Sequence, residues 1–159
     1  LSAFPAFEKD YPELAWTEAV RSRTGSGLQA VKLRMLLLAG REDDATALGT
    51  KLLEKGVKFN NPMALNEVAW LIVDPEMKIA KRDLDLAMKA AEKAVEATRG
   101  EDGAVLDTLA RVHYWKGDLA KAIEIQTKAV EKAATNPQML PELQATLDEY
   151  KAAVAAKKE

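Results

Sequence analysis

The chain has 159 residues, of which 48% are hydrophobic and 30% are charged, and its net charge is −2. This length predicts one folded unit, and the balance of 23 basic against 25 acidic side chains argues against a nucleic-acid or anionic-membrane partner. Cysteine is absent, which excludes disulfides and thiol catalysis within these residues. No apolar run approaches the roughly 20 residues that span a bilayer, so we expect no membrane insertion.

Residues 1–27 are predicted to form an N-terminal helix and a linker. Trp16 and Val20 have helical spacing within a predicted helix near residues 12–22, and the TGSG stretch that follows is typical of a loop. The first residue is Leu1, and no basic and then apolar leader follows it. We therefore expect the sequence to be part of a longer chain.

Two amphipathic helices joined by a tight turn are predicted within residues 102–136. Gly117 suits the left-handed C-cap of the first helix, and Asp118 suits the N-cap of the second. The small residues Ala110 and Ala122 allow the two helices to approach closely. The segment therefore predicts an interlocked helical hairpin.

The same pattern recurs within residues 61–99, where Ala69 and Ala87 stand at the positions of Ala110 and Ala122. The first pair is 18 residues apart and the second pair 12, so about six residues are inserted between the two helices of this unit. Proline in the inserted stretch prevents the first helix from continuing. We expect the stretch to form a surface loop, so that its removal leaves the helices nearly intact.

A weaker copy of the repeat occupies residues 28–60. Gly40 stands at the turn and Ala45 at the start of the second helix, whereas Leu33 occupies the position of the small residue. At the other end, residues 137–159 have apolar side chains at helical spacing and predict a C-terminal capping helix that Asn136 begins. The units 28–60, 61–99 and 102–136 together predict an all-α solenoid of about two and a half helical hairpins within residues 28–137.

This repeat resembles the tetratricopeptide repeat, a 34-residue helix-turn-helix unit. In the last copy Leu109 and Ala110 stand in for the Leu-Gly pair, His113 replaces the Tyr, Ala122 matches, and Gln126 replaces the aromatic residue. The resemblance implies a right-handed α-α superhelix whose concave surface is lined by the first helix of each hairpin. It also implies that the chain acts by binding other proteins.

Three stretches are similar, more narrowly, to the helical tail that follows the redoxin domain in some bacterial thioredoxin-like proteins. They are ALNEVAWLIVDP, LDLAMKAAEKAVEAT and DGAVLDTLARVHYWKGDLAKAIEIQTKAVEKA. This resemblance implies an upstream domain with a Cys-x-x-Cys motif and a periplasmic or extracytoplasmic location. Without it, the expected location is the cytoplasm.

The search for catalytic motifs returns no nucleophile elbow, no phosphate-binding glycine loop and no histidine cluster with metal-ligand spacing. His113 lies on an apolar helix face and is expected to be structural. The acidic residues at 42–44, 83 and 85 are predicted to lie at helix starts, where they complement the helix dipole. We therefore expect no enzyme activity and no cofactor or metal in these residues.

A binding groove is predicted on the first helices of the hairpins, from the side chains that point away from the hairpin core. Its candidate residues are Arg34, Asn66, Trp70, Asp107, Arg111 and Trp115. Trp and Arg often dominate interface energy, which favours a peptide site. Two other interpretations stay open, because Asp107 and Arg111 have the spacing of an i, i+4 ion pair and either Trp could pack against a neighbouring segment.

The sequence therefore predicts an interaction module that binds a peptide or a neighbouring domain, with an attached redoxin domain as one candidate partner. The alternative is a structural tail that packs on, or dimerises, such a domain without an external ligand. Neither the identity of the partner nor the oligomeric state follows from the sequence.

Overall fold

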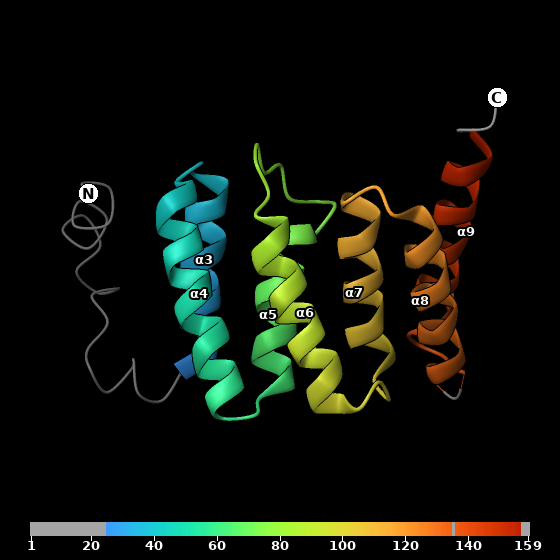
Figure 1. The fold of residues 1–159 in the computed structure, drawn as a ribbon, viewed down its shortest axis with the longest axis horizontal. Coiled ribbons are helices and arrows are strands. Elements are labelled where there is room, and N and C mark those ends of the chain that lie inside the picture. Colours follow the sequence, from blue (N-terminus) through green and yellow to red (C-terminus); the bar gives the residue numbers. More distant parts are fainter. Residues whose placement is uncertain (1–24, 135, 157–159) are drawn as a thin grey trace.

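The computed structural model describes residues 25–134 and 136–156, and every regular element in these two ranges is a helix. The helices are α3 (Gly25–Leu38), α4 (Glu42–Lys58), α5 (Pro62–Val73), α6 (Leu84–Thr98), α7 (Gly103–Trp115), α8 (Leu119–Lys132) and α9 (Leu140–Ala156). They stand side by side, from α3 and α4 at one edge to α8 and α9 at the other (Figure 1). The described part of the protein is therefore all-α.

The turns and helix starts follow the local sequence. Gly117 has a φ of 82°, the left-handed conformation that ends a helix, and Gly40 has a φ of 65° at the equivalent turn. The Asp118 side chain accepts the backbone N–H of Lys121, and Asp83 accepts that of Leu86. The predicted turn at Gly117 and N-cap at Asp118 are confirmed.

Small side chains form the contacts within the hairpins. Ala69, Ala87, Ala110, Ala122 and Ala129 are all fully buried, and they lie on the helix pairs α5–α6 and α7–α8, which pack together. A short side chain at such a contact lets two helix axes approach, because no longer group holds the backbones apart. The alanine pattern of the sequence thus marks the hairpin interfaces.

Two glycines allow helices to pack closely, Gly103 within the last hairpin and Gly56 between the first hairpin and the second. A Cβ at Gly103, the first residue of α7, would lie 2.9 Å from the carbonyl oxygen of Ala129 in α8. A Cβ at Gly56 in α4 would lie 2.7 Å from the Cδ2 atom of Leu65 in α5. Any larger residue would displace backbone at Gly103 and a core leucine at Gly56.

The first hairpin is complete, although the sequence predicted about two and a half hairpins. The fully buried Leu33 fills the position that alanine takes elsewhere, so this hairpin packs around a larger side chain. Its first helix begins at Gly25, inside the stretch predicted as a loop. That prediction was wrong because glycine and serine are tolerated in the first turn of a helix. The helix predicted near residues 12–22 lies outside the described residues.

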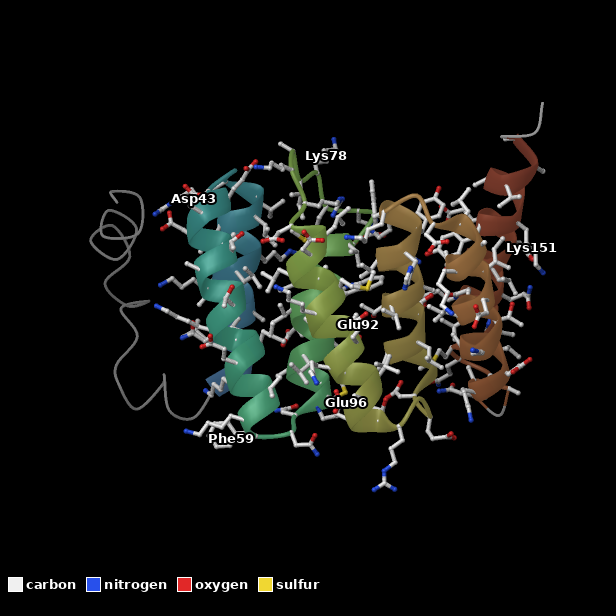
Figure 2. All side chains as sticks on the ribbon, in the orientation of Figure 1. Asp43, Phe59, Lys78, Glu92, Glu96 and Lys151 are labelled. Carbon is white, nitrogen blue, oxygen red and sulfur yellow. The ribbon has the colours of Figure 1, made fainter. Side chains whose placement is uncertain are left out.

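The stretch between α5 and α6 was predicted as a surface loop with few core contacts, and this prediction was wrong. Met77 is buried in the main hydrophobic core, and Asp74 is buried beside it. The Arg82 guanidinium donates hydrogen bonds to the carbonyl oxygens of Ile72 and Met77, the latter at 2.7 Å. The loop lies in the middle of the row and protrudes beyond the upper ends of the helices (Figure 1), and exposed Lys78 marks its outer part (Figure 2).

The C-terminal helix α9 begins at Leu140, three residues later than predicted. Asn136 still acts as a cap, because its side chain accepts the backbone N–H groups of Gln138 and Met139 and so closes a turn before the helix. Helix α9 packs on α8, and its buried Leu143, Leu147 and Tyr150 form the predicted apolar stripe.

Candidate functional site

The six candidate groove residues lie on the first helices of the three hairpins, Arg34 on α3, Asn66 and Trp70 on α5, and Asp107, Arg111 and Trp115 on α7. Their surroundings differ strongly. Arg34 is exposed, Asn66 and Trp70 are half-buried, and Asp107 and Arg111 are only 8% and 7% exposed. Helix α7 therefore does not present these two charged side chains as an open surface.

Arg111 is held between α5 and α9. Its guanidinium carbon lies 5.4 Å from the centre of the Trp70 ring, a cation–π distance, and its Nη2 donates to the Thr146 hydroxyl at 3.1 Å. The Nε of Arg111 is buried without a hydrogen-bond partner among the described residues. Arg111 thus supports one face of the Trp70 ring while α9 covers it.

Asp107 is joined to α8 and α9 through Gln126. The Gln126 Nε2 donates to Asp107 Oδ1 at 2.8 Å and to the carbonyl oxygen of Leu143 at 3.0 Å. Burial raises the pKa of the Asp107 carboxyl above its usual range, although the nearby Arg111 and the bond from Gln126 act in the opposite direction. Asp107 therefore helps to fasten α9 to the last hairpin.

The ion pair considered for Asp107 and Arg111 is not among the salt bridges of the described residues. Each side chain instead bonds to a different partner, Gln126 for the acid and Thr146 for the base. Their charges still attract one another, since Arg111 lowers the pKa of Asp107. The pair contributes to the structure through its neighbours on α8 and α9.

Tyr150 closes this region from α9. Its ring stacks on that of Tyr114 in α7, with centroids 4.5 Å apart, and its side chain is fully buried. The Tyr150 hydroxyl has no partner among the described residues, and burial raises the pKa of this phenol. Tyr150 and Tyr114 therefore form the apolar contact that complements the polar links of Asp107 and Arg111.

Trp115 contacts the end of α5 and the loop that follows it. Its indole Nε1 donates to the carbonyl oxygen of Val73 at 2.9 Å, and the Arg82 guanidinium lies 4.3 Å from its ring centre. The side chain remains 40% exposed. The two tryptophans predicted for one groove consequently have different partners, Arg111 for Trp70 and the loop for Trp115.

The α5 candidates are half-buried, more open than Asp107 and Arg111 and less open than Arg34 and Trp115. The Trp70 ring is half-buried, and the Asn66 side chain one turn earlier has an Oδ1 without a partner among the described residues. Helix α3, which carries exposed Arg34, packs against α5. By the repeat alignment Arg34 and Trp70 occupy equivalent positions on these adjacent first helices.

His113 is half-buried, with its Nδ1 3.7 Å from Asp118 Oδ2. Burial lowers the pKa of its imidazole, while Asp118 acts in the opposite direction. The acidic residues at 42–44 lie in the first turn of α4, and Asp83 caps α6, as predicted. Within residues 25–134 and 136–156 no group of three or more His, Asp or Glu side chains could hold a metal ion.

A separate cleft of about 420 Å³ lies between the first hairpin and the start of α6. Its apolar side includes Leu33 and Leu37, and its rim carries Glu42 and Lys81, whose charged groups are 3.3 Å apart. The Thr46 hydroxyl on the same rim donates to Asp83 at 2.8 Å. These polar groups satisfy one another across the cleft.

Sequence reasoning missed Gln126, Thr146 and Arg82 as the partners of the candidate residues. A signal existed for Gln126, because a polar residue between the buried Ile125 and Ala129 needs a hydrogen-bond partner. Thr146 and Arg82 gave no such signal, since their roles depend on how α9 and the loop pack.

The chain matches no family model, no curated protein and no solved structure. None of the helices in the described ranges has the length and apolar character of a membrane span.

Proposed function

We propose that the chain is an interaction module of the tetratricopeptide-repeat type, a right-handed superhelix that binds a peptide segment on its first helices. Three successive helical hairpins support this architecture, with equivalent glycine turns in the first and the last and buried alanines at the helix contacts of the second and the last. The resemblance of the last two copies to that repeat supports it as well. The proposal assigns no catalytic step and no cofactor to these residues.

The observation that carries the proposal is the arrangement around Trp70. The guanidinium of Arg111 lies against the ring and is itself held by Thr146, so the indole is fixed before any ligand binds. A half-buried, pre-positioned tryptophan costs little side-chain entropy on binding, which is a property of interface hot spots. The binding site is therefore centred on α5, with Arg34 of α3 at its edge.

The ligand is a peptide segment with two chemical features. An apolar side chain covers the open part of the Trp70 ring, and a carboxylate reaches exposed Arg34 on the adjacent helix. Asn66, whose Oδ1 lacks a partner, accepts a peptide N–H between them after a change of rotamer. In a longer chain of the thioredoxin-like kind, the segment belongs to the redoxin domain.

A selection from a displayed library of random peptides tests this function. The complete chain of residues 1–159 is immobilised for the selection, and the enriched peptides are then titrated separately into the parent and into Trp70→Ala. We expect enriched peptides that share an apolar and an acidic position. Because truncation of a hot-spot residue costs about 2 kcal/mol or more, Trp70→Ala should weaken their binding by about 30-fold.

The matched control is Lys151→Ala. Lys151 is exposed on α9, on the far side of the row of helices from α3 (Figure 2), and its removal should leave the affinity unchanged. Arg34→Ala should weaken the binding of peptides that contain the acidic position and leave their apolar-only analogues unaffected. No enrichment, or enriched peptides that bind Trp70→Ala as tightly as the parent, would refute the peptide site.

The structural tail is the second candidate, and the use of Asp107, Arg111 and Trp115 in internal contacts favours it. Because these three residues hold α9 and the loop in place, their side chains have a structural role without any external ligand. A tail that dimerises its parent protein should itself associate. Sedimentation equilibrium of the 159-residue chain at micromolar concentration should then give a dimer mass, whereas a monomer mass argues against the dimerising form of this alternative.

A further inference from the structure

Helix α3 carries an apolar stripe on the surface of the described structure. Val31, Met35 and Leu38, about one turn apart, are 56%, 47% and 52% exposed. The opposite face of α3 is buried in the core through Ala30, Leu33, Leu36 and Leu37. A helix that is apolar on both faces is typical of one that has neighbours on both sides.

Most of the equivalent positions are buried in the other two hairpins. The hairpins are aligned on three buried and equivalent residues, Leu33, Ala69 and Ala110. On this alignment Met35 corresponds to Leu71 in α5 and to Val112 in α7, which are both buried. Thr108, the α7 equivalent of Val31, is buried as well. At the positions of Val31 and Met35, the first hairpin is thus the most exposed of the three, whereas at the position of Leu38 the last hairpin also exposes Trp115.

Helices α5 and α7 each pack against the helix that precedes them in the chain. Leu52 of α4 and Leu33 of α3 line, together with Leu71 of α5, a space of only about 20 Å³. Helix α6 packs on α7 in the same order along the chain. The repeat geometry therefore provides a place for one further helix immediately before α3.

We propose that residues 12–22 dock as a helix against Val31 and Met35, in the place that α4 takes against α5. This segment contains Trp16 and Val20 at the i, i+4 spacing of one helix face. Three residues, 59–61, connect α4 to α5, and four residues, 99–102, connect α6 to α7. A helix ending at residue 22 leaves residues 23 and 24 as the connection to α3, and such short links place consecutive helices side by side.

The segment is favoured over a second copy of the chain as the occupant. A two-residue link gives the segment an effective concentration in the millimolar range or above at the α3 stripe. A second molecule at micromolar concentration competes poorly with it. Trp16 supplies the large apolar surface that the exposed Val31 and Met35 can cover.

Thiol alkylation of the complete chain tests the docking, because the sequence contains no cysteine to interfere. Met35→Cys places a thiol on the stripe, and Met63→Cys, at a position on α5 that is 68% exposed, provides the matched control. We expect iodoacetamide to modify the thiol at position 35 on the order of tenfold more slowly than the thiol at position 63, because the docked segment must open first.

A second substitution assigns the protection to the segment. Trp16→Asp, and independently Val20→Asp, should restore rapid alkylation of Met35→Cys while the far-UV circular dichroism of α3 to α9 is retained. The protection should also be the same at low and high protein concentration. The readout does not involve a bound peptide, so it is independent of the site at Trp70.

Two results would overturn the proposal. Equal alkylation rates at positions 35 and 63 at every protein concentration mean that nothing covers the stripe. Protection that increases with protein concentration and persists in both Trp16→Asp and Val20→Asp assigns the stripe to a second copy of the chain.

Discussion

The last hairpin and the first hairpin use the same repeat positions in opposite ways. On α7 the outward positions are closed, since Arg111 and Asp107 bond to Thr146 and Gln126. On α3 the residue equivalent to Arg111 is Arg34, which is exposed, and so is Met35 beside it. The role of a repeat position therefore depends on which helix packs beside it. A repeat signature alone therefore does not identify a binding residue.

The largest expected effect tests whether α9 closes the last hairpin through Tyr150. Tyr150→Ala removes a fully buried ring stacked on Tyr114, so we expect the free energy of unfolding to fall by about 3–5 kcal/mol in urea titrations. Tyr150→Phe is the control, and it should be neutral or slightly stabilising because the buried hydroxyl has no partner. A large loss in the Phe variant would show that the hydroxyl is satisfied after all.

The second effect concerns the loop between α5 and α6, which belongs to the closed region through Trp115. Met77→Ala should lower the free energy of unfolding by about 2–5 kcal/mol, because Met77 is buried in the main core. Lys78→Ala, at the exposed neighbouring position, should change it by less than about 0.5 kcal/mol. If both variants have similar melting temperatures, Met77 contributes little to the core, and the loop is a surface loop as the sequence predicted.

The third effect compares one repeat position in two hairpins. Ala110→Leu introduces into the last hairpin the side chain that Leu33 provides in the first. Because Ala110 is fully buried against α8, the larger side chain should cost about 1–3 kcal/mol. Ala104→Leu, at a half-buried position of the same helix, serves as the control for helix propensity. A variant at 110 that melts like the parent would contradict the alignment of the repeats.

The smallest effect is a pH dependence at the turn of the closed hairpin. Burial lowers the pKa of His113, so between its folded pKa and its ordinary value of about 6.5 the unfolded chain binds more protons than the folded one. Stability should therefore decrease as the pH falls through this window. His113→Gln should flatten that part of the urea-midpoint profile. An unchanged profile would mean that other groups cause the acid dependence.

The sequence was sufficient for features that depend on neighbouring residues. The turn at Gly117, the cap at Asp118 and the buried Ala110 and Ala122 all follow from local conformational preference and close helix packing. The burial of Arg111 did not follow, because it depends on where α9 lies. A polar stripe on a helix predicts exposure until a later segment covers it.

Local sequence rules were also insufficient for the loop between α5 and α6 and for the start of α3. The sequence correctly predicted that α5 ends before Pro75. No local rule predicts that Met77 enters the core or that Arg82 stacks on Trp115. The glycines near Gly25 favour a loop in isolation, whereas the helix extends through them in the folded chain. Tertiary contacts decided the outcome at Met77 and Arg82.

The central claim is that Trp70 serves binding whereas Trp115 serves the fold. The most direct test is calorimetric titration of one library-selected peptide into Trp70→Ala and Trp115→Phe. Both variants should first be shown to retain the helical circular dichroism of the parent. We expect Trp70→Ala to lose about 30-fold in affinity and Trp115→Phe to bind like the parent with a lower melting temperature. Equal losses of affinity in both variants, or no loss in Trp70→Ala, would contradict the account.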